Sequence, residues 1–170
     1  MKHLYILVAT LCLLGSCQSL KKTSDSKYLR WVGDIAFDPT LDDASFVVCN
    51  EEKAKQYHNF SKGMQYRGEK HALNKVFTEK YQAPKDSKET GLIRIRFIVN
   101  CKGETGRFRV QGMTEDYQEH KFDPKITAQL LRITKSLDGW MRMPNDDNAE
   151  DYYQYLIFKI NKGQLIEIMP

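Results

Sequence analysis

The stretch GLIRIRFIV, residues 91–99, decides the fold of this chain. Its apolar residues alternate with two arginines, and this period of two is typical of a strand with one buried face. Residues 100–103 (NCKG) follow as a turn, in which Gly103 can adopt a positive φ without steric cost. A second alternating run covers residues 107–111. The pattern therefore predicts an antiparallel hairpin.

The polar face of this hairpin carries four arginines, which are Arg94, Arg96, Arg107 and Arg109. Two interpretations are open. The arginines either lie on a solvated sheet face, where salt screens their charges, or form a docking surface for an anionic partner.

Two helices and a further strand are expected around the hairpin. Asp123 and Pro124 are typical of a helix start, and a stripe of apolar residues from Ile126 runs through Leu137 to Trp140, with Gly139 marking the end. An earlier helix is indicated by apolar residues between 72 and 77 at spacings of three and four. Residues 152–160 are rich in aromatic and β-branched residues and predict another strand, which residues 164–168 either continue or follow as a short fourth strand.

These elements predict an α+β domain over residues 64–170, in which one or two helices pack on a small antiparallel sheet in the order strand, strand, helix, strand. Residues 31–63 are expected to be an irregular lead-in that packs on this domain. Residues 17–30 are polar, lack periodicity and indicate a flexible tether.

Residues 1–16 have the features of a secretory signal: a basic tip, a short apolar stretch and small residues before Cys17. The apolar stretch is shorter than the about 20 residues that a membrane-spanning helix needs. The sequence LGSC at 14–17 resembles the lipobox of bacterial lipoproteins. The resemblance implies that Cys17 becomes the N-terminus and carries the lipid. The alternative is an ordinary signal peptide with a chance cysteine.

With Cys12 in the signal and Cys17 lipidated, Cys49 and Cys101 remain. An even number of cysteines in an oxidising compartment favours a disulfide. The alternative is two independent thiols. Neither cysteine lies in a CxxC motif, so the sequence gives little support for thioredoxin-like redox chemistry or zinc binding.

No arrangement of residues indicates catalysis, a metal site or a cofactor, and we predict a protein that is not an enzyme. The histidines lack the spacing of metal ligands, and no serine lies in a GxSxG setting. The acidic residues between 146 and 151 are expected to form a solvated loop. The formal net charge of +4 is mild and gives no argument for nucleic acid as a partner.

The chain from residue 64 to 168 resembles the TonB C-terminal domain, above all the energy-transducer versions of Bacteroidota. The resemblance rests on the order and spacing of YRGEKHAL at 66–73, Tyr81 with Pro84, the strand at 91–99 with its glycine turn, the helix after Phe122 and Asp123, Trp140 to Pro144, and YLIFKI at 155–160. It implies a TonB C-terminal-like fold and an extended peptide of an outer-membrane transporter as partner.

The chain also departs from that family. A TonB keeps an uncleaved membrane helix and a long proline-rich spacer, whereas this chain has a short tether and five prolines in total. The family's Gly-x-Pro segment before the last strand is replaced by residues 146–151. We therefore do not expect energy transduction.

The expected function is that of a binding or adaptor module in the cell envelope, anchored by lipid and facing the periplasm at the outer membrane. An extended peptide would add to an exposed C-terminal edge strand, with Tyr153, Tyr155, Ile157 and the four arginines as contacts. The alternative is a structural envelope lipoprotein that contacts peptidoglycan or a larger complex. The face with four arginines motivates this alternative, since glycan stems carry carboxylates.

Overall fold

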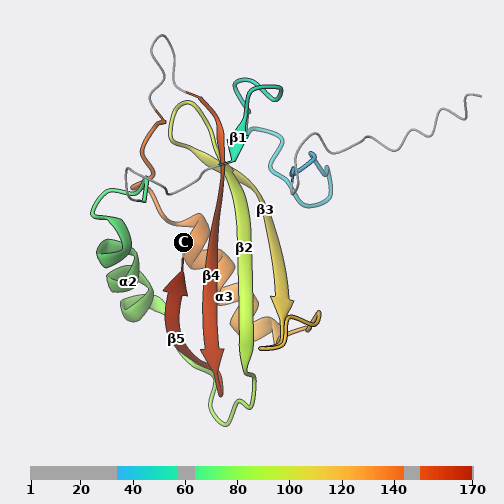
Figure 1. The fold of residues 1–170 in the computed structure, drawn as a ribbon, viewed down its shortest axis with the longest axis vertical. Helices are drawn as coiled ribbons and strands as arrows, with labels where there is room; N and C mark the ends of the chain where they lie inside the picture. The colour runs from blue at the N-terminus through green and yellow to red at the C-terminus, as the bar shows by residue number, and fades with distance from the viewer. Residues whose placement is uncertain (1–33, 57–63, 144–149, 170) are drawn as a thin grey trace, which may run out of the picture. The chain divides into compact units, whose positions relative to one another are not determined.

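The computed structural model of the protein describes residues 34–56, 64–143 and 150–169. The predicted signal, Cys17 and the tether lie outside these residues. The described residues hold two helices and five strands (Figure 1), which are β1 (Lys55–Gln56), α2 (Glu69–Lys80), β2 (Gly91–Val99), β3 (Thr105–Met113), α3 (Pro124–Lys135), β4 (Tyr152–Asn161) and β5 (Gln164–Met169). Neither of these helices is long and apolar enough to cross a membrane.

The strands form one sheet with β4 and β2 at its centre. These two strands pair antiparallel from Gly91 opposite Ile160 to Val99 opposite Tyr152. β3 pairs with the other side of β2, while β1 and β5 share the outer side of β4, β1 at its beginning and β5 at its end. The predicted α+β class is confirmed. The sheet is mixed rather than antiparallel, because β1 runs parallel to β4.

The predicted hairpin is present, with one irregularity in β3. Gly103 in the turn has a φ of 84°, as its position requires. The register shifts between Arg96 and Ile98, so that two residues of β3 face Phe97. Arg107 takes up the extra residue with a φ of 54°, the local geometry of a β-bulge.

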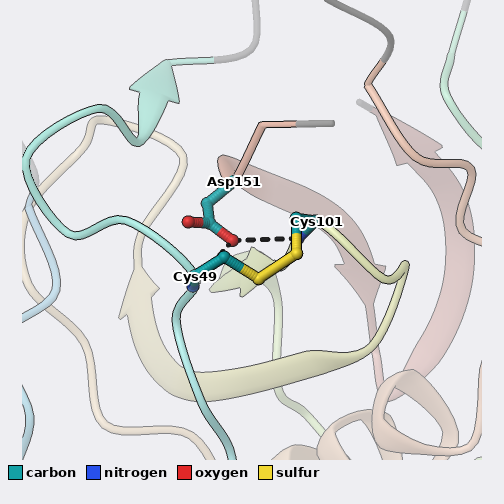
Figure 2. A group of neighbouring side chains, drawn as sticks. All are labelled: Cys49, Cys101 and Asp151. Atoms are coloured by element: carbon teal, nitrogen blue, oxygen red, sulfur yellow. Dashed lines mark hydrogen bonds between the residues drawn. A yellow bond between two sulfur atoms is a disulfide. The ribbon is translucent and has the colours of Figure 1, made fainter. Parts of the chain in front are cut away.

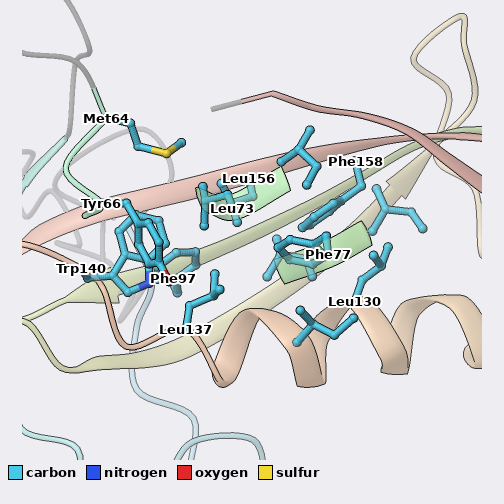
Figure 3. Close-up of a cluster of buried hydrophobic side chains, with 14 of the residues drawn as sticks. Met64, Tyr66, Leu73, Phe77, Phe97, Leu130, Leu137, Trp140, Leu156 and Phe158 are labelled. Atoms are coloured by element: carbon cyan, nitrogen blue, oxygen red, sulfur yellow. The ribbon is translucent and has the colours of Figure 1, made fainter. Parts of the chain in front are cut away.

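Both helices cover one face of the sheet and enclose the main core (Figure 3). Asp123 caps α3 by accepting a hydrogen bond from the backbone N–H of Lys125, and Pro124 occupies the first turn, as the sequence predicts. The ring of Phe77 from α2 lies 4.9 Å from that of Phe158 in β4. Burial of these apolar side chains against the sheet is the main stabilising contribution to the domain.

The end of α3 differs from the expectation. The helix stops at Lys135, where the N–H of Ser136 bonds to several carbonyls of the last turn, so Gly139 and Trp140 lie beyond the helix. Trp140 is still buried, in edge-to-face contact with Tyr66. A Cβ atom on Gly139 would lie 2.7 Å from the ring of Tyr66. Gly139 therefore permits close packing and does not end the helix.

The opposite face of the sheet, called here the outer face, is partly covered by the lead-in, residues 34–56. A second core forms there from Ile35 and Ala54 of the lead-in and from Ile98 and Tyr153 of the sheet. Phe46 lies directly over the backbone of β3, at a glycine. The predicted packing of the lead-in on the domain is present, and most of it is irregular, but it also contributes β1.

Candidate functional site

The residues proposed as partner contacts all belong to the β2, β3 and β4 part of the sheet. Arg96 lies opposite Arg109 on one side and Tyr155 on the other, and Arg94 lies opposite Ile157. Because directly opposed residues share a face, the structure brings these five side chains together on the outer face. The alternation in the sequence correctly places Arg94, Arg96 and Arg109 on one face of the hairpin.

Two of the four arginines are already engaged within the protein. Arg107 is 8% exposed and forms an ion pair with Glu51 of the lead-in, through both of its terminal nitrogens. Arg109 binds Asp42 of the lead-in in the same two-pronged way, with two N–O distances of 2.7 Å. Such bidentate pairs are geometrically specific. The expected docking surface of four arginines is therefore wrong for Arg107 and Arg109, which hold the lead-in on the sheet.

The pair of Arg109 with Asp42 also sets the charge state of both groups. The side chain of Asp42 is 1% exposed, and the hydrogen bond from Arg109 is the main cause that lowers the pKa of this carboxyl. The same hydrogen bond raises the pKa of Arg109. The two groups are thus charged together at neutral pH and below, down to acid pH.

Arg94 and Arg96 lie in a different environment. The guanidinium of Arg94 lies over the ring of Tyr155, with its carbon 5.0 Å from the ring centroid. Its Nε atom is buried and has no hydrogen-bond partner, and no carboxylate of the described residues forms an ion pair with Arg94. Burial lowers the pKa of Arg96, with a smaller contribution from the charge of Arg94.

The proposed contacts Tyr153, Tyr155 and Ile157 do not lie on an edge strand, and this expectation is wrong. Their strand, β4, has β2 along one side and β1 and β5 on the other. The reason is a tight turn at Lys162 and Gly163, both with positive φ, which reverses the chain and lays β5 against the end of β4. Tyr153 is buried under the lead-in, while Tyr155 and Ile157 are half-buried.

The C-terminal edge strand is β5, and it borders a groove. The groove has a volume of about 570 Å³ and runs between α2 and β5, with the buried Phe77 and Ile168 among its lining residues. Lys70 of α2 and Glu167 of β5 approach each other at 3.5 Å. Ile166 is an extra residue in the register with β4 and has a side chain that is 56% exposed.

The other edge strand, β3, is better protected. Its end is covered by the following loop, where the N–H of His120 donates to the carbonyl of Gly112 and Thr114 exchanges bonds with Gln118. Its beginning carries the bulge and the arginine pairs to the lead-in. Bulges, charges and covering loops are the devices by which proteins block pairing at a sheet edge. Of the two described edges, β5 is therefore the more accessible.

Cys49 and Cys101 form a disulfide in the structure, the first of the two alternatives (Figure 2). Beside it, Asp151 accepts hydrogen bonds from the backbone N–H groups of Cys49, Asn50 and Cys101 at 2.6 to 3.2 Å. Asp151 is 2% exposed, so the expectation of a solvated loop is wrong for this residue. Residues 144–149 lie outside the described part of the chain.

The same three side chains bring two sulfur atoms and a carboxylate within 4.8 Å of one another. A metal would need deprotonated thiolates, but here the sulfur atoms are bonded to each other. The carboxylate oxygens already accept three N–H bonds. This cluster is a structural fastening of the lead-in to the turn between β2 and β3.

No protein-family model matches the chain, and neither a curated protein nor a solved structure shows significant similarity to it. The resemblance to the lipobox and to TonB C-terminal domains therefore stays a prediction from the sequence.

Proposed function

We propose that the protein is a lipid-anchored binding module of the cell envelope, which captures an extended peptide by adding it as a strand to β5. The observation that carries this proposal is the position of β5. It is an edge strand, and its side away from β4 borders the groove next to α2. A peptide paired with β5 gains main-chain hydrogen bonds, and pockets for alternate side chains provide specificity.

The lining of the groove fits such a ligand. The half-buried side chains of Tyr81 and Leu165 offer apolar surface, while Asn74 and Thr78 of α2 and Gln164 of β5 offer hydrogen-bonding side chains. The lining is more polar than apolar, so hydrogen bonds to the peptide would provide much of its recognition. Ile166 adds an exposed apolar side chain on the strand itself.

The resemblance to TonB C-terminal domains supports the periplasmic segment of an outer-membrane transporter as the partner. The lipid at Cys17 would hold the module at the membrane, facing the periplasm. The alternative role on peptidoglycan depended on the surface of four arginines. Since Arg107 and Arg109 are paired with Glu51 and Asp42, no observation of the structure favours that role.

Site-specific photo-crosslinking in intact envelopes tests this function. A photoreactive amino acid replaces Ile166 on β5 or, as the matched control, the exposed Val110 on the protected strand β3. We expect crosslinks to an extended segment of a partner protein from position 166 and none from position 110. Equal crosslinking from both positions, or none from position 166, would overturn the proposal.

A further inference from the structure

The outer face of the sheet has a part that no described segment crosses (Figure 1). It is called here the open patch and consists of the half-buried side chains of Leu92, Arg94, Arg96, Tyr155 and Ile157. The patch lies beside the lead-in on the same strands. It is distinct from the groove, whose lining residues belong to α2, β5 and the segment that follows α2.

The covered part of the outer face shows what kind of segment this sheet binds. The lead-in brings two carboxylates, Asp42 and Glu51, to the guanidinium groups of two arginines. Ile35, which precedes Asp42, and Phe46, which lies between the two acids in the sequence, place apolar side chains on the sheet. The occupant of the covered part is therefore an irregular segment in which acidic residues alternate with apolar ones.

The part of the open patch around Arg94 continues the same chemistry, whereas the charge of Asp34 in the lead-in acts on Arg96. Arg94 is held over Tyr155, so its guanidinium is already oriented, and its Nε donor is buried without a partner among the described residues. Leaving a buried donor unsatisfied is costly, and a carboxylate of a ligand would remove this cost. Ile157 and Leu92 on either side supply the apolar surface.

We propose that the open patch binds an acidic and apolar segment of another polypeptide, with a carboxylate of that segment on Arg94 and an apolar side chain on Ile157. The pair of Arg109 with Asp42 shows such a bidentate contact through the two terminal nitrogens, and on Arg94 the two parallel N–H to O bonds would come from Nε and one terminal nitrogen. This interaction goes beyond strand addition at β5 and uses other residues.

The charges of the chain itself argue for a partner rather than its own undescribed segments. Residues 18–33 contain Lys21, Lys22, Lys27 and Arg30 but only one acid, Asp25, and residues 57–63 contain no acid. Residues 144–149 contain two acids, but the residues on either side of this segment, Met143 and Glu150, pair with each other. Ile157 lies seven residues beyond Glu150, which is about 23 Å of mostly extended chain. Six residues between two paired ends can extend only about 10 Å from those ends, so their acids cannot reach Ile157.

Binding of synthetic peptides to the full chain tests the proposal. The probe is a ten-residue peptide in which Asp and Glu alternate with Val, Leu and Phe, and its control has Asn and Gln in place of the acids. NMR of the Arg94 Nε–H group and fluorescence polarisation report binding. We expect a shift of the Arg94 signal with the acidic peptide only, and an affinity that falls as salt is added.

Three variants locate the interaction. Arg94→Gln should weaken binding by about tenfold or more, and Arg94→Lys, which keeps the charge but not the bidentate geometry, by less. Lys125→Gln removes an exposed charge of α3, which covers the opposite face of the sheet, and should leave the affinity unchanged. Melting curves of all variants check that the fold is kept.

Several results would overturn the proposal. One is equal affinity of the wild-type chain and Arg94→Gln, and another is equal binding of the acidic and neutral peptides. Acetate that shifts the Arg94 signal as much as the peptide at equal carboxylate concentration would show an anion site without peptide recognition. Binding to vesicles with anionic headgroups but not to the acidic peptide would assign the patch to a membrane surface. Since none of these probes requires β5, crosslinking from Ile166 can fail or succeed independently.

Discussion

At the scale of single residues, Asp151 connects three parts of the chain. Its two carboxylate oxygens accept N–H groups from the lead-in and from the turn between β2 and β3, directly before β4 begins. The sequence does not predict this role, because Asp151 is the last residue of an acidic run that has the composition of a solvated loop. Its hydrogen-bond donors are 50 to 102 residues away, so no local pattern could reveal them.

Replacing Asp151 by Asn should destabilise the protein. The amide offers one oxygen instead of two, and its NH₂ group would face a backbone N–H that has lost its acceptor. The expected loss in the free energy of unfolding is about 1–3 kcal/mol, measured by urea denaturation at pH 7. The matched control is Glu115→Gln, a change at an exposed carboxylate after β3, which should change the free energy of unfolding by less than about 0.5 kcal/mol. Equal losses for the two variants would contradict the role of Asp151.

The arginines show the limit of sequence reasoning at this scale. Their alternation correctly places Arg94, Arg96 and Arg109 on one face of the hairpin. Their partners Asp42 and Glu51 lie 67 and 56 residues away from Arg109 and Arg107, in a segment without periodicity. The acidic residues of the lead-in were a signal that could have suggested pairing, but which acid meets which arginine is determined by the tertiary fold.

At the scale of elements, the hairpin and the start of α3 could be predicted because both depend on local rules. Alternation specifies β2, and a capping aspartate followed by proline specifies the start of α3. The edge strand could not be predicted with the same certainty. Residues 164–168 are compatible with a continuation of β4 or with a new strand, and the turn at Lys162 and Gly163 decides between them.

This turn is held to Tyr81, the residue that follows α2, by a hydrogen bond that the Tyr81 hydroxyl donates to the carbonyl of Gly163 at 2.7 Å. Tyr81→Phe removes the bond without changing the packing of the ring. We expect a loss of about 1 kcal/mol in the free energy of unfolding. The exposed Tyr117 is the control, since Tyr117→Phe should leave the stability unchanged.

Alkaline pH should have a related effect. Burial raises the pKa of Tyr81 from 10.0 to about 12, so the folded chain keeps this proton in a range where the unfolded chain loses it. The contribution of Tyr81 to stability is therefore complete below pH 10 and is lost as the pH rises towards 12. The difference in stability between wild type and Tyr81→Phe should shrink over that range. A constant difference from pH 9 to pH 12 would contradict this assignment.

At the scale of the whole molecule, the lead-in is part of the fold rather than an appendage. Its sequence lacks regular periodicity, yet it supplies β1, half of the second core and the carboxylates that pair with two arginines. The disulfide joins it to the hairpin turn, closing a segment of 52 residues. In the chain-entropy model, a loop of this length contributes about 4 kcal/mol to stability.

The variant Cys49→Ser with Cys101→Ser should lower the free energy of unfolding by an amount of that order. The loss should be observed in urea denaturation of the oxidised wild type against the double variant. The wild type treated with a dithiol reductant is the control and should match the variant. If the stability of the wild type does not change on reduction, the disulfide does not fasten the lead-in as described.

The central claim is that β5 accepts an extended peptide from a partner. Amide hydrogen exchange of the full chain, with and without the partner segment identified by crosslinking at Ile166, tests it most directly. We expect slower exchange of the amides in β5 when the segment is bound, while the amides of β3 are unchanged. Unchanged exchange in β5, or slower exchange confined to β3 or to the open patch, would contradict the claim.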